Sequence, residues 1–311
     1  MSSVRTSVDR YVELRRNLGF RMEPHECLLR SFASYLEQHK AAHITTVLAM
    51  SWAQLPTKAQ PAHRARRLGI VRLFARYLSA SDSRTEVPAE GLLPFRCKRR
   101  APYIYSDAEI RRLLSAAHRM RSRAGLRAAT YTTLIGLLVV TGLRISEAVA
   151  LDESADVDLE RGVLTIRRTK FGKSRLVPLH PSTTRALRRY LLVRNRVHPT
   201  RTTSALFVGE GGRRLTAWTI RRTFIHLSRQ TGLRGPTDRC GPRLHDLRHR
   251  FAVTTLLHWY RRGVDVEQRL PRLSTFLGHG HVSDTYWYLS AVPELMRLAA
   301  KRLDLLQGDP S

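Results

Sequence analysis

Residues 162–180 read GVLTIRRTKFGKSRLVPLH, and this stretch decides the fold class. Apolar and polar residues alternate on both sides of Phe171 and Gly172, a pattern typical of two antiparallel strands joined by a short turn. Pro178 lacks a backbone N–H group, so it predicts that the second strand lies at the edge of its sheet. The stretch therefore predicts a β-hairpin with Lys170 at its tip.

The sequence around the hairpin has the periodicity of helices. Before it, residues 131–140 form an apolar helical pattern that ends at Gly142, and a further helix is expected to begin near Arg144. Ser106 followed by Glu109 predicts the capped start of an earlier helix. After the hairpin, helices are expected at about 183–197, 216–230 and 245–259. We therefore expect a mainly α fold with a small antiparallel β-sheet.

The N-terminal region has a different character. From Ser7 to about Leu78, apolar residues recur every three or four positions, which predicts four or five short helices. Their polar faces are basic, as in RRNLGFR and HRARRLGIVRLFAR. Residues 79–102 are instead rich in turn-forming residues. These changes divide the chain into an N-terminal helical domain (1–85), a linker (86–103), a second domain (104–290) and a tail (291–311).

The tail has the leucine spacing of an amphipathic helix, at Leu295, Leu298, Leu303 and Leu306. We therefore predict a C-terminal tail helix over 291–311.

The composition is strongly basic. The 311 residues include 54 Lys and Arg against 25 Asp and Glu, a formal net charge of +29. Such an excess concentrates polyanions around a protein, so nucleic acid is the first partner to consider. Arg greatly outnumbers Lys, which a GC-rich coding sequence would also produce, and charge alone does not identify a ligand. A membrane surface is less favoured, because no segment resembles an interfacial anchor.

Other features of the sequence favour a cytoplasmic protein. The N-terminal segment MSSVRTSVDRYVEL lacks the apolar stretch of a secretory signal, and the longest wholly apolar run, 134–140, is too short to cross a bilayer. Cys27, Cys97 and Cys240 are far apart and have no CxxC spacing, so they predict neither a disulfide nor a cysteine zinc site. We expect association with the bacterial nucleoid when the protein is bound to DNA.

Four separated segments carry residues suited to the chemistry of a phosphodiester. They are TGLRISE (141–147), the hairpin tip, HDLRH (245–249) and LGHGHVSDTYWY (277–288), which supply Arg144, Lys170, His245, Arg248, His279 and Tyr288. A phosphodiester is anionic, so fixed cations must face its non-bridging oxygens, where charge grows in the transition state. Arginine provides planar donor pairs that stay charged. A tyrosine phenol, with a pKa of about 10, needs a proton acceptor and a positive surrounding to attack.

Together and in this order, the segments resemble the tyrosine recombinase (phage integrase) family over nearly the whole second domain. The resemblance implies that Tyr288 attacks DNA to give a 3′-phosphotyrosyl link and a free 5′-hydroxyl group. It implies no metal and no other cofactor. It also assigns the remaining roles: general base His245, general acid Lys170, phosphate contacts Arg144, Arg248 and His279, and an orienting carboxylate, Glu147.

The resemblance selects one residue from each of two neighbouring pairs. In the family the nucleophile lies nine residues beyond the Leu-Gly-His histidine, which selects Tyr288 and predicts that Tyr286 is a packing residue. Alignment of the hairpin turn selects Lys170 as the catalytic lysine and leaves Lys173 as a phosphate contact.

The resemblance further implies a two-domain clamp around double-stranded DNA, with an N-terminal core-binding domain and a catalytic domain at 104–290. It implies a homo-tetramer on DNA, or a hetero-tetramer with related recombinases, in which the tail helix docks on a neighbouring protomer. The expected reaction is integration, excision or transposition of a mobile element. Residues 259–274, WYRRGVDVEQRLPRLS, are longer and more basic than the usual connection, which leaves their local fold open.

Three other interpretations stay open at this point. A DNA-binding protein could keep the fold without activity, although the complete set of catalytic candidates argues against it. A zinc hydrolase could use His245 and His249, because HDLRH is similar to the zinc-binding HExxH helix; however, Asp246 stands where that motif has its catalytic glutamate. A type IB topoisomerase shares the chemistry, but the chain is short and its motif spacing is that of integrases.

Overall fold

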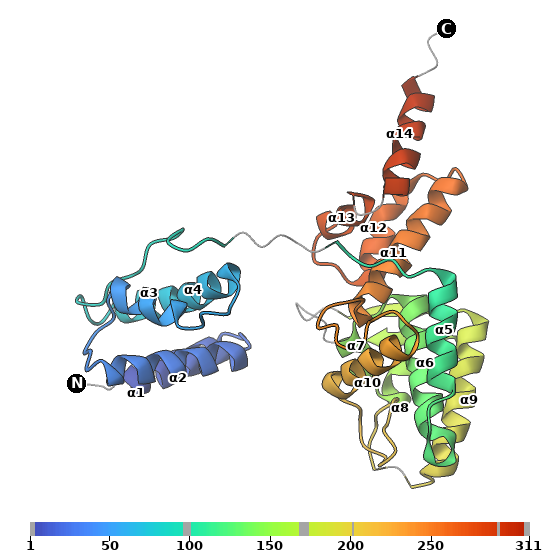
Figure 1. The fold of residues 1–311 in the computed structure, drawn as a ribbon, viewed down its shortest axis with the longest axis horizontal. Coiled ribbons are helices and arrows are strands. Elements are labelled where there is room, and N and C mark those ends of the chain that lie inside the picture. Colours follow the sequence, from blue (N-terminus) through green and yellow to red (C-terminus); the bar gives the residue numbers. More distant parts are fainter. Residues whose placement is uncertain (1–3, 96–100, 168–173, 201, 291–292, 308–311) are drawn as a thin grey trace. The chain divides into compact units, whose positions relative to one another are not determined.

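The computed structural model describes residues 4–95, 101–167, 174–200, 202–290 and 293–307. The chain divides into two compact units, Met1–Arg100 and Ala101–Ser311, whose elements are drawn in Figure 1. Helices dominate both units and one small sheet lies in the second, so the predicted fold class is confirmed. Within the described residues, no helix is both long and apolar enough to cross a membrane.

The described part of the first unit, residues 4–95, contains four helices: α1 (Val4–Asn17), α2 (Glu23–Gln38), α3 (Thr46–Gln54) and α4 (Pro61–Leu78). Each buries an apolar face in a common core that includes Phe32, Trp52 and Phe74. Arg67 of α4 is buried there too: its guanidinium lies 3.7 Å from the centroid of the Trp52 ring and donates to the Trp52 carbonyl oxygen over 2.9 Å. The ring and the carbonyl offset part of the cost of burying this charge, and burial still lowers the pKa of Arg67.

The first helices of the second unit begin and end where local signals predict. α5 (Asp107–His118) begins with a capping box, in which the side chains of Ser106 and Glu109 accept each other's backbone N–H groups. α6 (Leu126–Thr141) ends at Gly142, whose φ of +61° lies in the left-handed region that glycine adopts readily. Arg144 is the N-cap residue of α7 (Ile145–Ala150), and α8 (Glu153–Asp156) follows.

The sheet consists of β1 (Val157–Asp158), β2 (Val163–Ile166) and β3 (Arg175–Pro178), all antiparallel and in the order β1-β2-β3. Val163 pairs with Pro178 and Ile166 with Arg175, so the two predicted antiparallel strands are confirmed. In this sheet β3 is an edge strand, as Pro178 predicts. β1 was not predicted, because two residues are too few to show an alternating pattern.

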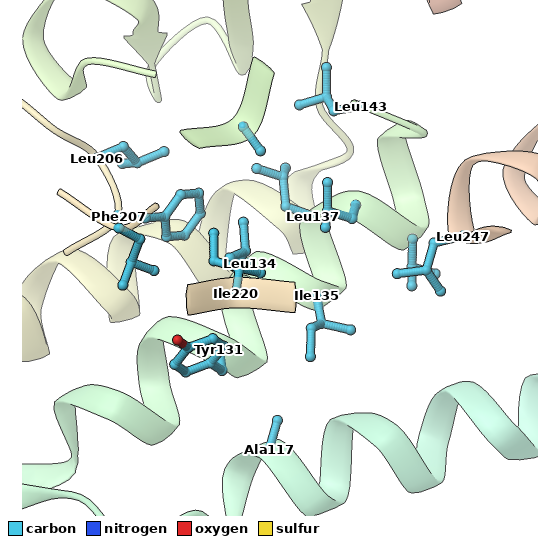
Figure 2. Packing of buried hydrophobic residues seen from close by; sticks show 14 of the residues in the cluster. Ala117, Tyr131, Leu134, Ile135, Leu137, Leu143, Leu206, Phe207, Ile220 and Leu247 are labelled. Atoms are coloured by element: carbon cyan, nitrogen blue, oxygen red, sulfur yellow. The ribbon is translucent and has the colours of Figure 1, made fainter. Parts of the chain in front are cut away.

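Helix α6 is central to the second unit. It packs against α5, α9 (Pro181–Val197) and α11 (Leu244–Arg261), while α10 (Ala217–Gln230) adds to the same core (Figure 1). Figure 2 shows Leu134, Phe207 and Ile220 together in this core and Leu247 of α11 to one side. Because the core fixes α6 against α11, it also fixes the loop after α6 relative to the first turn of α11.

The basic segment that the sequence left open forms a helix, α12 (Val266–Leu277). Asp265 begins it by accepting hydrogen bonds from backbone N–H groups of the first turn. Two further helices follow, α13 (Ser283–Ser290) and α14 (Pro293–Gln307), so the tail contains a helix. Leu295 of α14 is fully buried in a small core shared with α11, α12 and α13, and Glu294 pairs with Arg261 of α11 at 2.7 Å.

Candidate active site

The C-terminal ends of α6 and α12 meet the first turn of α11 at Arg248. This arginine is 2% exposed; its Nη1 donates to the carbonyl oxygen of Gly142 over 2.9 Å and its Nη2 to that of Leu277 over 2.7 Å. Burial, together with the nearby charge of Arg144, lowers the pKa of Arg248 to about 10. The guanidinium therefore stays positively charged at neutral pH while holding two helix ends together.

Arg144 is held by Glu147, one turn later in α7. The carboxylate of Glu147 accepts the Arg144 backbone N–H over 2.9 Å through Oε2 and the Arg144 Nη1 over 2.8 Å through Oε1. Nη2 of Arg144 donates to the carbonyl oxygen of Gly278 over 3.0 Å. About a quarter of the Arg144 side chain remains exposed, so its guanidinium stays accessible to a ligand.

Arg175 of β3 completes this network, and the sequence did not single it out. Its Nη1 and Nη2 donate to Oε1 and Oε2 of Glu147 over 3.1 and 2.8 Å, and its Nε donates to the Phe276 carbonyl oxygen over 2.7 Å. Burial alone would raise the pKa of Glu147, but the hydrogen bonds and charges of Arg175 and Arg144 outweigh burial and hold that pKa below its usual range. The buried carboxylate is therefore ionised. In the sequence, Arg175 is recognisable only as a charged residue at the start of a strand, and this does not reveal that its partner is Glu147.

Tyr288 of α13 is packed in the same site and is only 3% exposed. Its ring stacks on that of His279, with centroids 6.0 Å apart and planes 20° apart, and lies 5.4 Å from the ring of His249. Burial raises the pKa of the Tyr288 phenol, while the charge of Arg248 and its hydrogen bond with the phenol oppose that rise. Arg248 thus favours the ionised form of the Tyr288 phenol.

His279 lies in the turn between α12 and α13. Its Nδ1 is 2.7 Å from the hydroxyl of Thr285, which is fully buried. Burial, with the charges of Arg248 and Arg144, lowers the pKa of His279 to about 4, so the ring is neutral at pH 7. When the Thr285 hydroxyl donates to Nδ1, the other ring nitrogen carries the proton and is a hydrogen-bond donor.

His245 and His249 lie one turn apart on α11, with ring centroids 4.7 Å apart and planes nearly perpendicular. The His245 ring reaches the surface, but partial desolvation and the Arg248 charge lower its pKa, so the neutral form that accepts a proton is favoured at pH 7. Burial and then His245 lower the pKa of the buried His249 to about 4. Across the described ranges, no three His, Cys, Asp or Glu side chains gather as a metal-binding group.

The structure brings most of the predicted residues into one site. Arg144, Glu147, Arg248, His279 and Tyr288 are linked by the contacts above, and His245 lies at the edge of the same site. The predicted catalytic lysine and its neighbour lie outside the described residues, since the structure does not describe 168–173, which contains Lys170 and Lys173.

One prediction for residues 277–288 is wrong. Tyr286 is not a packing residue, because it is 52% exposed. Two positions along a helix correspond to a rotation of about 200°, so burying Tyr288 turns Tyr286 towards solvent.

The electrostatics of the site favour an anion. Three arginines, Arg144, Arg175 and Arg248, surround one ionised carboxylate, so about two positive charges remain without an acidic partner within this group. The Tyr288 phenol and the imidazoles of His245 and His279, whose lowered pKa values favour their neutral forms at pH 7, lie beside these charges. The arrangement suits attack by the Tyr288 phenol on a phosphate whose oxygens face the arginines.

A sequence profile described as the phage integrase family matches residues 104–294, which is more than half of the chain and contains every residue of this site. The chain belongs to the phage integrase family. This integrase-family chain is 54% identical over 308 residues to the putative integrase/recombinase y4rB of Sinorhizobium fredii, covering 98% of both. The family is named for integrases, and y4rB is named as an integrase or recombinase.

Two solved structures share the fold of this phage integrase family member. The XerH site-specific recombinase bound to a palindromic difH substrate aligns with a TM-score of 0.68 at 20% identity, covering 95% of this chain and 84% of that one. The Tn1549 transposon integrase in complex with circular intermediate DNA also aligns with a TM-score of 0.68, at 18% identity, covering 97% and 100%. At such identities the likeness concerns the fold, and it agrees with the mainly α fold and small antiparallel sheet.

Proposed function

We propose that this chain is a tyrosine-type site-specific DNA recombinase with Tyr288 as its nucleophile. The Tyr288 oxygen attacks the scissile phosphorus, the bond from phosphorus to the 5′-oxygen breaks, and a 3′-phosphotyrosyl link forms. The phenol proton passes to a base, and the departing 5′-oxygen takes a proton from an acid. Attack by a different 5′-hydroxyl group reverses these steps and joins new strands, so the reaction needs no ATP.

The observation that carries this proposal is the position of Tyr288 between Arg248 and His279 in a site with excess positive charge. Arg144 and Arg248 bind the non-bridging oxygens, where fixed donors stabilise the charge that grows in the transition state. His245 accepts the phenol proton, since its lowered pKa favours the neutral form. His279 donates a hydrogen bond to the phosphate.

Two roles in the proposal rest on the family resemblance. Lys170 serves as the general acid for the departing 5′-oxygen, and Glu147 orients Arg144. The ion pair between Arg144 and Glu147, at 2.8 Å, is consistent with the second role.

Double-stranded DNA is the proposed partner. The net charge of +29 supports it, and so do the names of the two solved relatives, each of which is bound to DNA. We assign core binding to residues 1–85, a linker role to 86–103, catalysis to 104–290 and an assembly role to 291–311. Most contacts should go to phosphates, so binding should weaken steeply as salt is raised.

Exchange between two duplexes requires four strand cuts, and each chain carries one Tyr288. We therefore propose a tetramer assembled on DNA, either of this chain alone or with related recombinases. Integration, excision or transposition of a mobile element is the proposed outcome, in line with the name of the transposon integrase that shares the fold.

The proposal is tested by covalent trapping. The purified full chain is incubated with fragmented DNA from its own source and denatured in detergent, and the DNA that stays attached to protein is sequenced. Tyr288→Phe serves as the matched control, because it removes one hydroxyl group and keeps the ring. DNA trapped by the wild type alone supports the mechanism and identifies the target site.

Two other outcomes count against the proposal. Equal trapping by wild type and Tyr288→Phe would exclude Tyr288 as the nucleophile. DNA binding without any trapping, over the range of fragments tested, would point to a DNA-binding protein that keeps the fold without the activity.

A further inference from the structure

The carboxylate of Glu147 is shared evenly between two arginines. Each of its oxygens accepts one hydrogen bond from Arg144 and one from Arg175, all four between 2.8 and 3.1 Å. The two arginines differ in their surroundings: the Arg175 side chain is 7% exposed, whereas that of Arg144 is 26% exposed. Arg175 is therefore the buried partner of the pair, and Arg144 is the partner that a phosphate can reach.

We propose that Arg175 is a positioning residue for strand cleavage, which acts on the phosphate through Glu147 and Arg144. This inference rests on the proposed function of the site. Arg175 does not touch the phosphate; it occupies half of the Glu147 carboxylate and so limits how much of that carboxylate Arg144 can engage. One Nη group of Arg144 faces Glu147 and the other faces a backbone carbonyl oxygen, which leaves its remaining N–H groups for the ligand.

Charge balance supports the same role. Glu147 alone would neutralise Arg144, because an ionised carboxylate beside a guanidinium at 2.8 Å cancels most of its field at a distance. Arg175 forms a two-pronged pair with that carboxylate and offsets its charge. Arg144, Glu147 and Arg175 together therefore keep one net positive charge. Arg144 is the more exposed of the two arginines, so a phosphate would meet this charge there.

A third hydrogen bond ties Arg175 to the other partner of Arg144. Nε of Arg175 donates to the Phe276 carbonyl oxygen over 2.7 Å, at the end of α12. Two residues later, the Gly278 carbonyl oxygen accepts a hydrogen bond from Nη2 of Arg144. Arg175 thus holds both the carboxylate and the turn that fix the Arg144 guanidinium, and the same turn continues into His279.

The role is tested by single-turnover formation of the covalent protein–DNA complex on the DNA identified by trapping. The variants are Arg175→Lys, which keeps the charge but loses the two-pronged geometry, and Arg175→Gln, which loses both. The expected result is a fall in rate on the order of 100-fold for Arg175→Gln, with a smaller fall for Arg175→Lys and unchanged DNA affinity.

The chain offers a matched control at Arg194. Its side chain is also buried, pairs with the Glu153 carboxylate and donates to the backbone carbonyl oxygens of Ala205 and Leu206, yet it is not in contact with the site. Arg194→Gln should lower the melting temperature as much as Arg175→Gln while keeping the covalent rate of the wild type. Equal loss of covalent rate in both variants would reduce Arg175 to a general stabilising role and overturn the inference.

A double-mutant cycle separates positioning from stability. Because Arg175 acts through Arg144, the rate penalty of Arg175→Gln should shrink at least several-fold in an Arg144→Lys background, while its effect on melting temperature should persist. Independent, multiplicative rate penalties would overturn the inference. Failure of the wild type to trap DNA through Tyr288 is a different result, which rejects the proposed function and the inference with it.

Discussion

A methyl group added to Gly278 would lie 2.6 Å from Nη1 of Arg175. The glycine is the C-cap residue of α12, with φ at +70°, and its carbonyl oxygen accepts the hydrogen bond from Arg144. The Arg175 guanidinium, which binds Glu147, therefore packs directly against the turn before His279. A side chain at position 278 would have to displace that guanidinium.

Gly278→Ala should reduce the rate of covalent complex formation by about tenfold or more, because the new methyl group must move a guanidinium that makes three hydrogen bonds. Gly263→Ala is the matched control. Gly263 has a similar φ, +66°, but a Cβ there would meet nothing within 4 Å. Both variants should lose about 1 kcal/mol of stability from the left-handed backbone, and only Gly278→Ala should lose rate. Parallel behaviour of the two variants would contradict this prediction.

Glu147→Gln should lower the free energy of unfolding by about 3 kcal/mol, since it leaves the buried Arg175 without a carboxylate. The covalent rate should also fall, because Arg144 loses its ionic anchor. Urea unfolding and the trapping assay measure the two effects. Glu153→Gln removes the carboxylate partner of Arg194 and should cost stability without loss of rate.

Stability should fall as the pH is lowered from about 6.5 towards 4. The pKa values of His249 and His279 are lowered to about 4, and that of His245 is lowered too. Between the ordinary histidine pKa and the lowered one, the unfolded chain binds more protons than the folded chain, so acid favours unfolding. For the buried His249 alone, the difference corresponds to about 3 kcal/mol once the pH is below 4.

Thermal unfolding at pH 7 and pH 5 checks this point. His249→Phe keeps an aromatic ring beside Tyr288 and has no group to titrate, so its melting temperature should change less between the two pH values than that of the wild type. A steeper pH dependence in His249→Phe would contradict the assignment.

Leu295→Ala should cost about 2–5 kcal/mol, because this fully buried residue of α14 fills the small core with α11. Met296→Ala, at an exposed neighbouring position, should change stability little. Deletion after Ala291 would therefore test the fold as well as assembly. Deletion after Lys301 keeps Leu295, and it should preserve folding and DNA binding but reduce recombination if the tail docks on a neighbouring chain.

Local signals were enough to predict many helix ends and the hairpin. Ser106 with Glu109 and Gly142 each act within one turn of backbone, so the sequence contains all that decides them. The start of the helix at Thr216 follows the same rule, since its side chain accepts from the backbone N–H of Thr219.

Long-range partners could not be predicted in this way. Arg175 meets a carboxylate 28 positions away and a carbonyl group 101 positions away, and no periodicity encodes such a pair. Tyr286 was predicted to pack because the family spacing assigned the nucleophile role to Tyr288, but the burial of Tyr288 on the same short helix turns Tyr286 towards solvent. The motif residues were found because the chemistry of a phosphate requires their types and because their order resembles a known family, whereas the role proposed for Arg175 depends on partners that are distant in the sequence.

The burial of Tyr288 has a consequence for the resting enzyme. Only 3% of the residue is accessible in the conformation described, so the side chain must become more accessible before its phenol can attack a phosphodiester. In the proposed reaction, contact with DNA is therefore not enough for cleavage, because Tyr288 must first leave its buried position.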